Sequence, residues 1–103
     1  MQTVGQIIRA NREKQGLLLR QLAAQLDVDT AILSKIERGE RKPTKEQILK
    51  IAGIFKLDKD ELLIQYLSDK IAYEIADEDV AARTLKVAEQ KVRYLKLSKH
   101  GKI

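Results

Sequence analysis

The chain has 103 residues, no cysteine and a net charge of +5. Its length supports one compact domain with a small core and at most an appended element, and the missing cysteine excludes disulfides and thiolate metal sites. No stretch approaches the roughly 18 apolar residues of a membrane span, so we expect a soluble, cytoplasmic protein.

Apolar residues recur at helical spacing along almost the whole chain, and no stretch alternates as a strand does. We expect a first helix over about residues 2–14, ended by Gly16, and a second helix over 19–26. A tight turn at 27–29 then leads into a third helix, so two short helices follow each other closely.

The third helix is expected over residues 30–38, with Asp29 as its N-cap and Gly39 at its end. Leu33 and Ile36 are three residues apart and therefore share one face, which we expect to be buried.

The fourth helix follows a basic loop at 40–43 that contains the only proline. Thr44 and Gln47 have the spacing of a capping box, with Thr44 as the N-cap. Its expected buried face consists of Ile48, Leu49, Ile51, Ala52 and Phe55.

A fifth helix is expected to begin at the capping segment 58–61 and to carry Leu62, Leu63, Tyr66 and Leu67. Its apolar pattern continues through Ile71 and Ile75. After an acidic turn, a long helix is predicted over about 80–97, and residues 98–103 form a basic, frayed tail.

Two short helices joined by a tight turn and followed by a basic loop are typical of a helix-turn-helix. The run LAAQLDVDTAILSKIERGERKPTKEQILKIAGIFKLDKDELL, which begins at Leu22, resembles the Cro/C1-type helix-turn-helix family, also called the XRE family. The matching motifs are Leu22-Ala23, the turn at 36–39 and the helix start at 42–44. The likeness extends over about residues 3–67.

This resemblance implies an all-α fold: a five-helix, lambda-repressor-like helix-turn-helix domain with a C-terminal helical extension. We therefore expect a DNA-binding domain at 1–67, an extension for dimerisation or capping at 68–97, and a flexible tail at 98–103. The phage-repressor likeness also implies that the third helix contacts DNA bases.

By that resemblance, the base-contacting residues are Thr30, Ala31, Ser34 and Lys35. Ile32 is also expected to point outward. Lys35 can donate to guanine, Thr30 can bond to either groove edge, and Ala31 can meet a thymine methyl group. The alternative is that Thr30 and Ala31 only begin the helix.

Arg38, Arg41, Lys42 and Lys45 surround the end of the third helix and the start of the fourth, so they suit phosphate contact. The N-terminus of the fourth helix adds backbone N–H groups that favour phosphate. The alternative is a solvated basic loop.

Glu37 is ill-suited to face DNA. In the family, an arginine of the first helix pairs with the glutamate at this position, and the matching residue here is Arg12. We therefore predict an Arg12–Glu37 ion pair with a structural role.

The start of the second helix departs from the family. Family members commonly carry Ser or Thr and then Gln where this chain has Leu18 and Leu19, so an N-cap and a phosphate contact are both lost. We expect Gln21 to reach back to the cap N–H, and Leu18 to pack on the C-terminal extension or a partner chain, with Leu19 as a second candidate for the same contact. Arg20 would replace the lost phosphate contact.

The long C-terminal helix has a thin apolar stripe made of Val80, Thr84, Val87, Ala88, Val92 and Leu95, with Lys91 beside it. Ile71 and Ile75 are its candidate partners in an αα-hairpin. The stripe must pack either on its own domain, as a strut, or on a second chain, as a dimer interface. A dimer is favoured because the core is small and because such proteins read two half-sites.

Enzyme chemistry is not expected, because the only histidine, His100, lies in the tail and no glycine-rich phosphate loop is present. No metal, cofactor, membrane or small-molecule ligand is indicated. The sequence favours a sequence-specific regulator that binds a symmetric double-stranded DNA operator as a homodimer. The alternative is a protein-interaction module on the same scaffold, an antitoxin or an enzyme partner.

Overall fold

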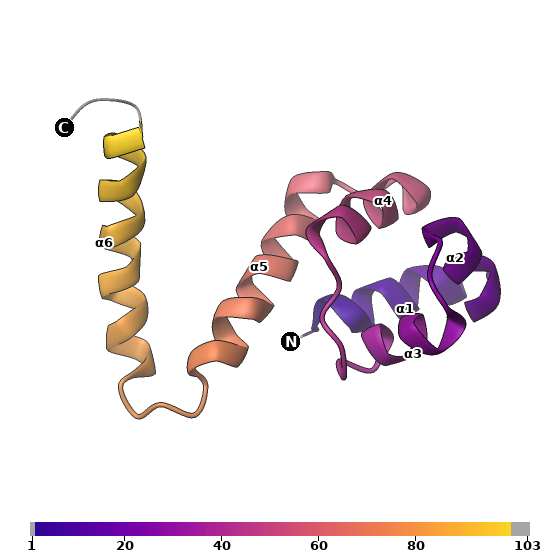
Figure 1. The fold of residues 1–103 in the computed structure, drawn as a ribbon, viewed down its shortest axis with the longest axis horizontal. Helices are drawn as coiled ribbons and strands as arrows, with labels where there is room; N and C mark the ends of the chain where they lie inside the picture. Colours follow the sequence, from indigo (N-terminus) through magenta and orange to yellow (C-terminus); the bar gives the residue numbers. More distant parts are fainter. Residues whose placement is uncertain (1, 100–103) are drawn as a thin grey trace. The chain divides into compact units, whose positions relative to one another are not determined.

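The computed structural model describes residues 2–99, and within this range all regular secondary structure is α-helical (Figure 1). The helices are α1 (Val4–Lys14), α2 (Leu19–Leu26), α3 (Thr30–Glu37), α4 (Lys45–Phe55), α5 (Lys59–Ile75) and α6 (Ala81–Lys99). The expected all-α fold is therefore confirmed. Helix α6 continues through Ser98 and Lys99, which were expected to lie in a frayed tail, and the rest of that tail lies outside the described residues.

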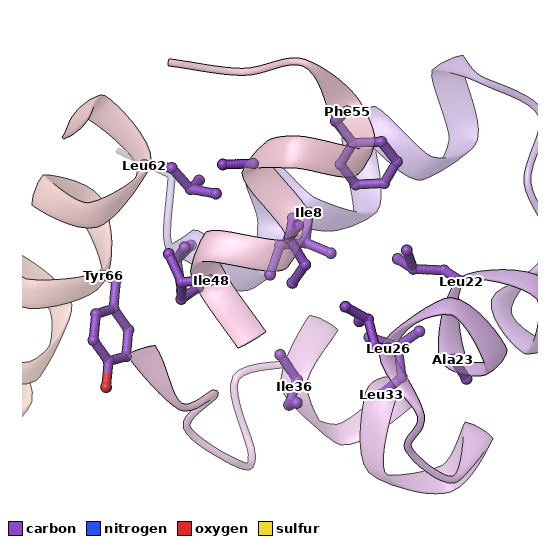
Figure 2. Packing of buried hydrophobic residues seen from close by; sticks show 13 residues of the cluster. Ile8, Leu22, Ala23, Leu26, Leu33, Ile36, Ile48, Phe55, Leu62 and Tyr66 are labelled. Carbon is purple, nitrogen blue, oxygen red and sulfur yellow. The ribbon is translucent and has the colours of Figure 1, made fainter. Parts of the chain in front are cut away.

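The chain divides into two compact units, residues 1–71 and residues 72–103. The first unit holds the core, which 13 buried apolar side chains from α1 to α5 form together (Figure 2). The most deeply buried large ones are Ile8, Leu22, Leu33, Ile48 and Ile51. Each such side chain stabilises the fold by about 1.5–3 kcal/mol, so this cluster dominates the stability of the unit.

Local sequence signals define most helix ends. Thr3 and Gln6 form a capping box at α1, and Thr44 and Gln47 form one at α4. At Asp29 the position is as expected, but its carboxylate makes no capping hydrogen bond, and only its backbone carbonyl accepts the first bond of α3.

Left-handed backbone terminates several helices. Gly16 and Gly39 have φ angles of 70° and 79°, in the region that glycine adopts without steric cost. Asp27 and Lys56 adopt the same conformation at the ends of α2 and α4 despite having side chains.

Two contacts of α1 fix its position in the first unit. A Cβ on Gly5 would lie 2.4 Å from the carbonyl oxygen of Ile36, so the backbones of α1 and α3 touch at this point. The N–H of Val4 donates to Oδ2 of Asp69 at 2.7 Å, which ties the first turn of α1 to α5. Neither contact was expected from the sequence.

The second unit contains α6, and no residue of this helix is buried. In the described part of the chain, no helix is long and apolar enough to cross a membrane.

Candidate nucleic-acid interface

Helix α3 has a buried side and an exposed side. Leu33 and Ile36 are 0% and 3% exposed and anchor the helix in the core. Thr30, Ala31 and Lys35 are exposed, and Ser34 is half-buried. All four expected base-contacting residues therefore lie on α3, and Ser34 is the least accessible of them to solvent.

Ile32 does not point outward as expected, because it is partly buried and packs against the core. It precedes Ile36 by four residues, so the two side chains lie on one face of the helix. The buried stripe of α3 is thus wider than the two residues that the sequence indicated, and its outward face is narrower.

The loop after α3 is held by main-chain hydrogen bonds. The carbonyl oxygen of Lys35 accepts from the N–H of Glu40 at 2.9 Å and from the N–H of Arg41 at 3.3 Å. Pro43 is buried, so the loop returns to the core before α4 begins. The geometry of the loop is therefore fixed by its backbone and leaves its basic side chains at the surface.

All five residues expected to contact phosphate are exposed: Arg20, Arg38, Arg41, Lys42 and Lys45. Nε of Arg38 lies 2.6 Å from a carboxylate oxygen of Glu40, in a pair that is about half exposed on both sides. Such a pair exchanges readily with water or with another anion, because exposed pairs stabilise by about 1 kcal/mol at most.

At the start of α4, the capping box uses two backbone N–H groups. The N–H of Gln47 donates to Oγ1 of Thr44, and the N–H of Thr44 donates to Oε1 of Gln47. The amides of Lys45 and Glu46 lie outside this box, at the positive end of the helix dipole. An anion at this end would be attracted both by the dipole and by the neighbouring basic side chains.

The structure contains the Arg12–Glu37 ion pair. Nε and Nη2 of Arg12 donate to the two carboxylate oxygens of Glu37 at 2.8 and 3.0 Å, and Nη1 donates to the carbonyl oxygen of Leu17 at 2.9 Å. The side chains are 14% and 5% exposed. The hydrogen bond to Glu37 raises the pKa of Arg12 above its usual value, burial opposes this effect, and the charge of Glu37 adds to it. One guanidinium thus joins α1, the turn before α2 and the end of α3.

Leu18 is 48% exposed and is not buried in the first unit, so its packing on the extension or on a partner chain stays a prediction. It occupies the N-cap position of α2 and offers no acceptor, but its N–H donates to Oε1 of Gln21 at 2.8 Å, as expected. Leu19 is partly buried, and the surface that it packs against is the core of the first unit. Half of the lost capping box is therefore kept by Gln21, and Leu18 lies outside the face that α2 buries.

The family described as helix-turn-helix (HTH_3) matches residues 8–62, just over half of the chain. Two proteins of Mycobacterium tuberculosis, the uncharacterised HTH-type transcriptional regulators MT0491 and Rv0474, are each 34% identical to this chain over 61 residues. That alignment covers 59% of this chain and 44% of each relative, so the chain matches less than half the length of these relatives.

Solved structures give the same fold. A crystal structure of SinR, described as the master regulator for biofilm formation, in complex with DNA, has a TM-score of 0.53 at 29% identity and covers 59% of this chain and 98% of its own. The clp gene regulator ClgR from Corynebacterium glutamicum has a TM-score of 0.55 at 28% identity, and the match covers 82% of this chain and 88% of ClgR. A SinR–SinI complex, at 21% identity and a TM-score of 0.54, supports the fold alone.

The matched region includes α2, α3 and the basic loop between α3 and α4, where the sequence motifs lie. The chain therefore belongs to the helix-turn-helix family of the Cro/C1, or XRE, type.

Proposed function

We propose that this protein is a transcriptional regulator that binds a specific double-stranded DNA sequence in the cytoplasm and acts by occupying it, without a chemical reaction. The observation that carries the proposal is the two-sided helix α3. Its buried stripe and the Arg12–Glu37 pair hold it in place, while Thr30, Ala31 and Lys35 remain exposed. Family membership and the likeness to SinR, which was solved with DNA, support the same function.

In this proposal the outward face of α3 enters the major groove. Lys35 donates to a guanine edge, and Thr30 and Ala31 contact bases near the start of the helix. Ser34 is the fourth base-contacting residue, although its partial burial restricts its reach. Each specific pairing contributes about 1–3 kcal/mol of discrimination between bases.

Phosphate contacts would come from the basic residues around α3, namely Arg20, Arg38, Arg41, Lys42 and Lys45. All five are exposed, and the N-terminus of α4 provides further donors beside them. These contacts set affinity and orientation rather than sequence preference.

We also propose that the protein binds as a homodimer to a symmetric operator. Dimers of this class read two half-sites about 34 Å apart, or a multiple of that distance. If each protomer neutralises about four phosphates, the logarithm of the binding constant falls with the logarithm of salt concentration with a slope of roughly −7.

The test is a selection of binding sites from random duplex DNA, followed by binding titrations at several salt concentrations. Recovery of one preferred, symmetric sequence is expected. Lys35→Ala should weaken binding to that site by about 1–3 kcal/mol and relax the preference at one base pair. Lys86→Ala, which removes an exposed cation from α6, is the matched control and should leave the preference unchanged. Recovery of no sequence preference, or a salt slope near zero, would contradict the proposal.

A further inference from the structure

Helix α5 has two apolar faces. Leu62 and Tyr66 are buried and dock the helix on the core, whereas Ile64, Leu67 and Ile71 are 55%, 43% and 51% exposed. At 100° per residue, Ile64, Leu67 and Ile71 lie on the side of the helix away from Leu62. We call these three residues the α5 stripe. An aligned apolar row of this kind marks an interaction surface more often than scattered single residues do.

Helix α6 carries a second row at the same spacing. Ala81, Leu85, Ala88, Val92 and Leu95 follow one another at alternating intervals of four and three residues, the spacing of a coiled-coil seam. Leu85, Val92 and Leu95 are 48%, 51% and 59% exposed. We call these five residues the α6 stripe. The α5 stripe has the matching intervals of three and four, so the two rows suit each other as partner seams.

The charges decide which rows pair. Helix α6 carries six basic residues and one acidic residue, a net charge of +5. Residues 59–79, which contain α5 and the turn after it, carry seven acidic and two basic residues, a net charge of −5. Two α6 helices would repel each other along their length, whereas α6 and α5 attract. The chemistry that fits the α6 stripe is therefore an acidic helix with an apolar row, and a second copy of this chain supplies one.

We propose that the α6 stripe of one copy packs on the α5 stripe of a second copy, and that the second copy returns the same contact. In a two-fold symmetric dimer each such contact occurs twice, so both rows of both copies are covered. This inference rests on the homodimer of the proposed function and names its two surfaces. The bond from Val4 to Asp69 ties α5 to α1, so the α5 stripe is held firmly on the DNA-binding unit.

The test uses two double variants that break one row each. In the α5 variant, Leu67→Gln and Ile71→Gln remove the first row, and in the α6 variant, Leu85→Gln and Val92→Gln remove the second. Glutamine keeps the helix propensity close to that of leucine, and all four side chains are about half exposed, so the fold should be retained. Circular dichroism checks this. Leu97→Gln is the matched control, because Leu97 is 50% exposed on the side of α6 away from Ala88.

Sedimentation velocity and native mass spectrometry then give the oligomeric state. Wild type and the Leu97→Gln control should be dimeric, and each double variant should be monomeric at the same concentration, because both reciprocal contacts are broken. An equimolar mixture of the two double variants should recover a heterodimer, weaker than the wild-type dimer. It keeps one intact contact, between the α6 stripe of the α5 variant and the α5 stripe of the α6 variant.

Other outcomes overturn the inference. A monomeric wild type would show that the rows are not covered by a second copy. A double variant that remains dimeric alone would mean that its altered row is not part of the interface, and a mixture without heterodimer would rule out the exchange between α5 and α6. Binding of both double variants to a single DNA half-site is measured separately. Loss of that binding in every protein, with the recovered heterodimer intact, would refute the DNA-binding proposal and leave this inference standing.

Discussion

The Arg12–Glu37 pair allows a quantitative prediction for Glu37→Ala. The substitution removes two of the three hydrogen bonds that the Arg12 guanidinium donates and leaves only the bond to Leu17. Breaking a buried ion pair by removing one partner costs about 3–5 kcal/mol. Because the Arg12 side chain keeps 14% exposure and one acceptor, we expect the lower end, about 3 kcal/mol.

Chemical denaturation followed by circular dichroism measures this loss as a fall in the midpoint at unchanged slope. On heating, about 3 kcal/mol corresponds to a fall of roughly 12–24 °C in Tm for a domain of this size. The chain offers a matched control in Arg9→Ala. Arg9 pairs with Glu13 at 2.6 Å, but the two side chains are 61% and 55% exposed. This control should cost about 0.5 kcal/mol or less.

A double variant separates the ion pair from a general packing effect. Arg12→Met with Glu37→Leu removes both charges, so no guanidinium is left without its partner, and the double variant should be more stable than Glu37→Ala alone. If Glu37→Ala costs no more than Arg9→Ala, the pair does not hold α1 and α3 together and the reasoning fails.

Three further predictions concern the same unit. Gly5→Ala should destabilise the protein by about 1–3 kcal/mol in the same denaturation assay, since the new Cβ would meet the backbone of Ile36. Gly53→Ala has open space around it in α4 and should stabilise the protein by about 0.5–1 kcal/mol. Equal effects of the two substitutions would contradict the close approach of α1 to α3. Leu18→Thr should raise stability by about 1 kcal/mol, because it supplies the missing N-cap acceptor at a half-exposed position, and an unchanged midpoint would mean that the cap is satisfied in another way. The hydrogen bond to the Glu37 carboxylate raises the pKa of Arg12 in the folded protein. The stabilisation from this ion pair is therefore complete below the pKa of an arginine in the unfolded chain, and it is lost only at higher pH. The stability difference between wild type and Arg12→Ala should therefore stay constant from about pH 7 to pH 10, and a decline within this range would refute this account.

Features that depend on nearby residues were predictable from the sequence. The capping box of Thr44 and Gln47 needs only a spacing of three residues, and the structure contains it. The first five helices start within about two residues of their expected starts, and the first three also end within two residues of their expected ends. No end was predicted for α4 or α5. The Arg12–Glu37 pair joins residues far apart in sequence, and only the family resemblance pointed to it.

Features that depend on packing between distant segments were not predictable. Gly5 reads as an ordinary helix residue, and its role appears only where α1 meets the carbonyl of Ile36. Asp69 lies in a polar position of a long helix, and nothing in the sequence links it to the N–H of Val4. Leu18 is half exposed because α2 buries a different face, made of Leu22, Ala23 and Leu26, and this face is set by packing rather than by the capping position. The DNA contacts and the dimer remain predictions.

The backbone of Lys35 holds the basic loop in place, whereas its side chain is the proposed contact to a DNA base. Its carbonyl oxygen anchors the basic loop through the amides of Glu40 and Arg41, and every amino acid carries that carbonyl. Its side chain is exposed and adds nothing to the core. Surface substitutions of this kind usually change stability by less than about 0.5 kcal/mol. A substitution at position 35, in evolution or by design, can therefore change the DNA sequence preference while the loop from residue 38 to residue 43 keeps its backbone geometry.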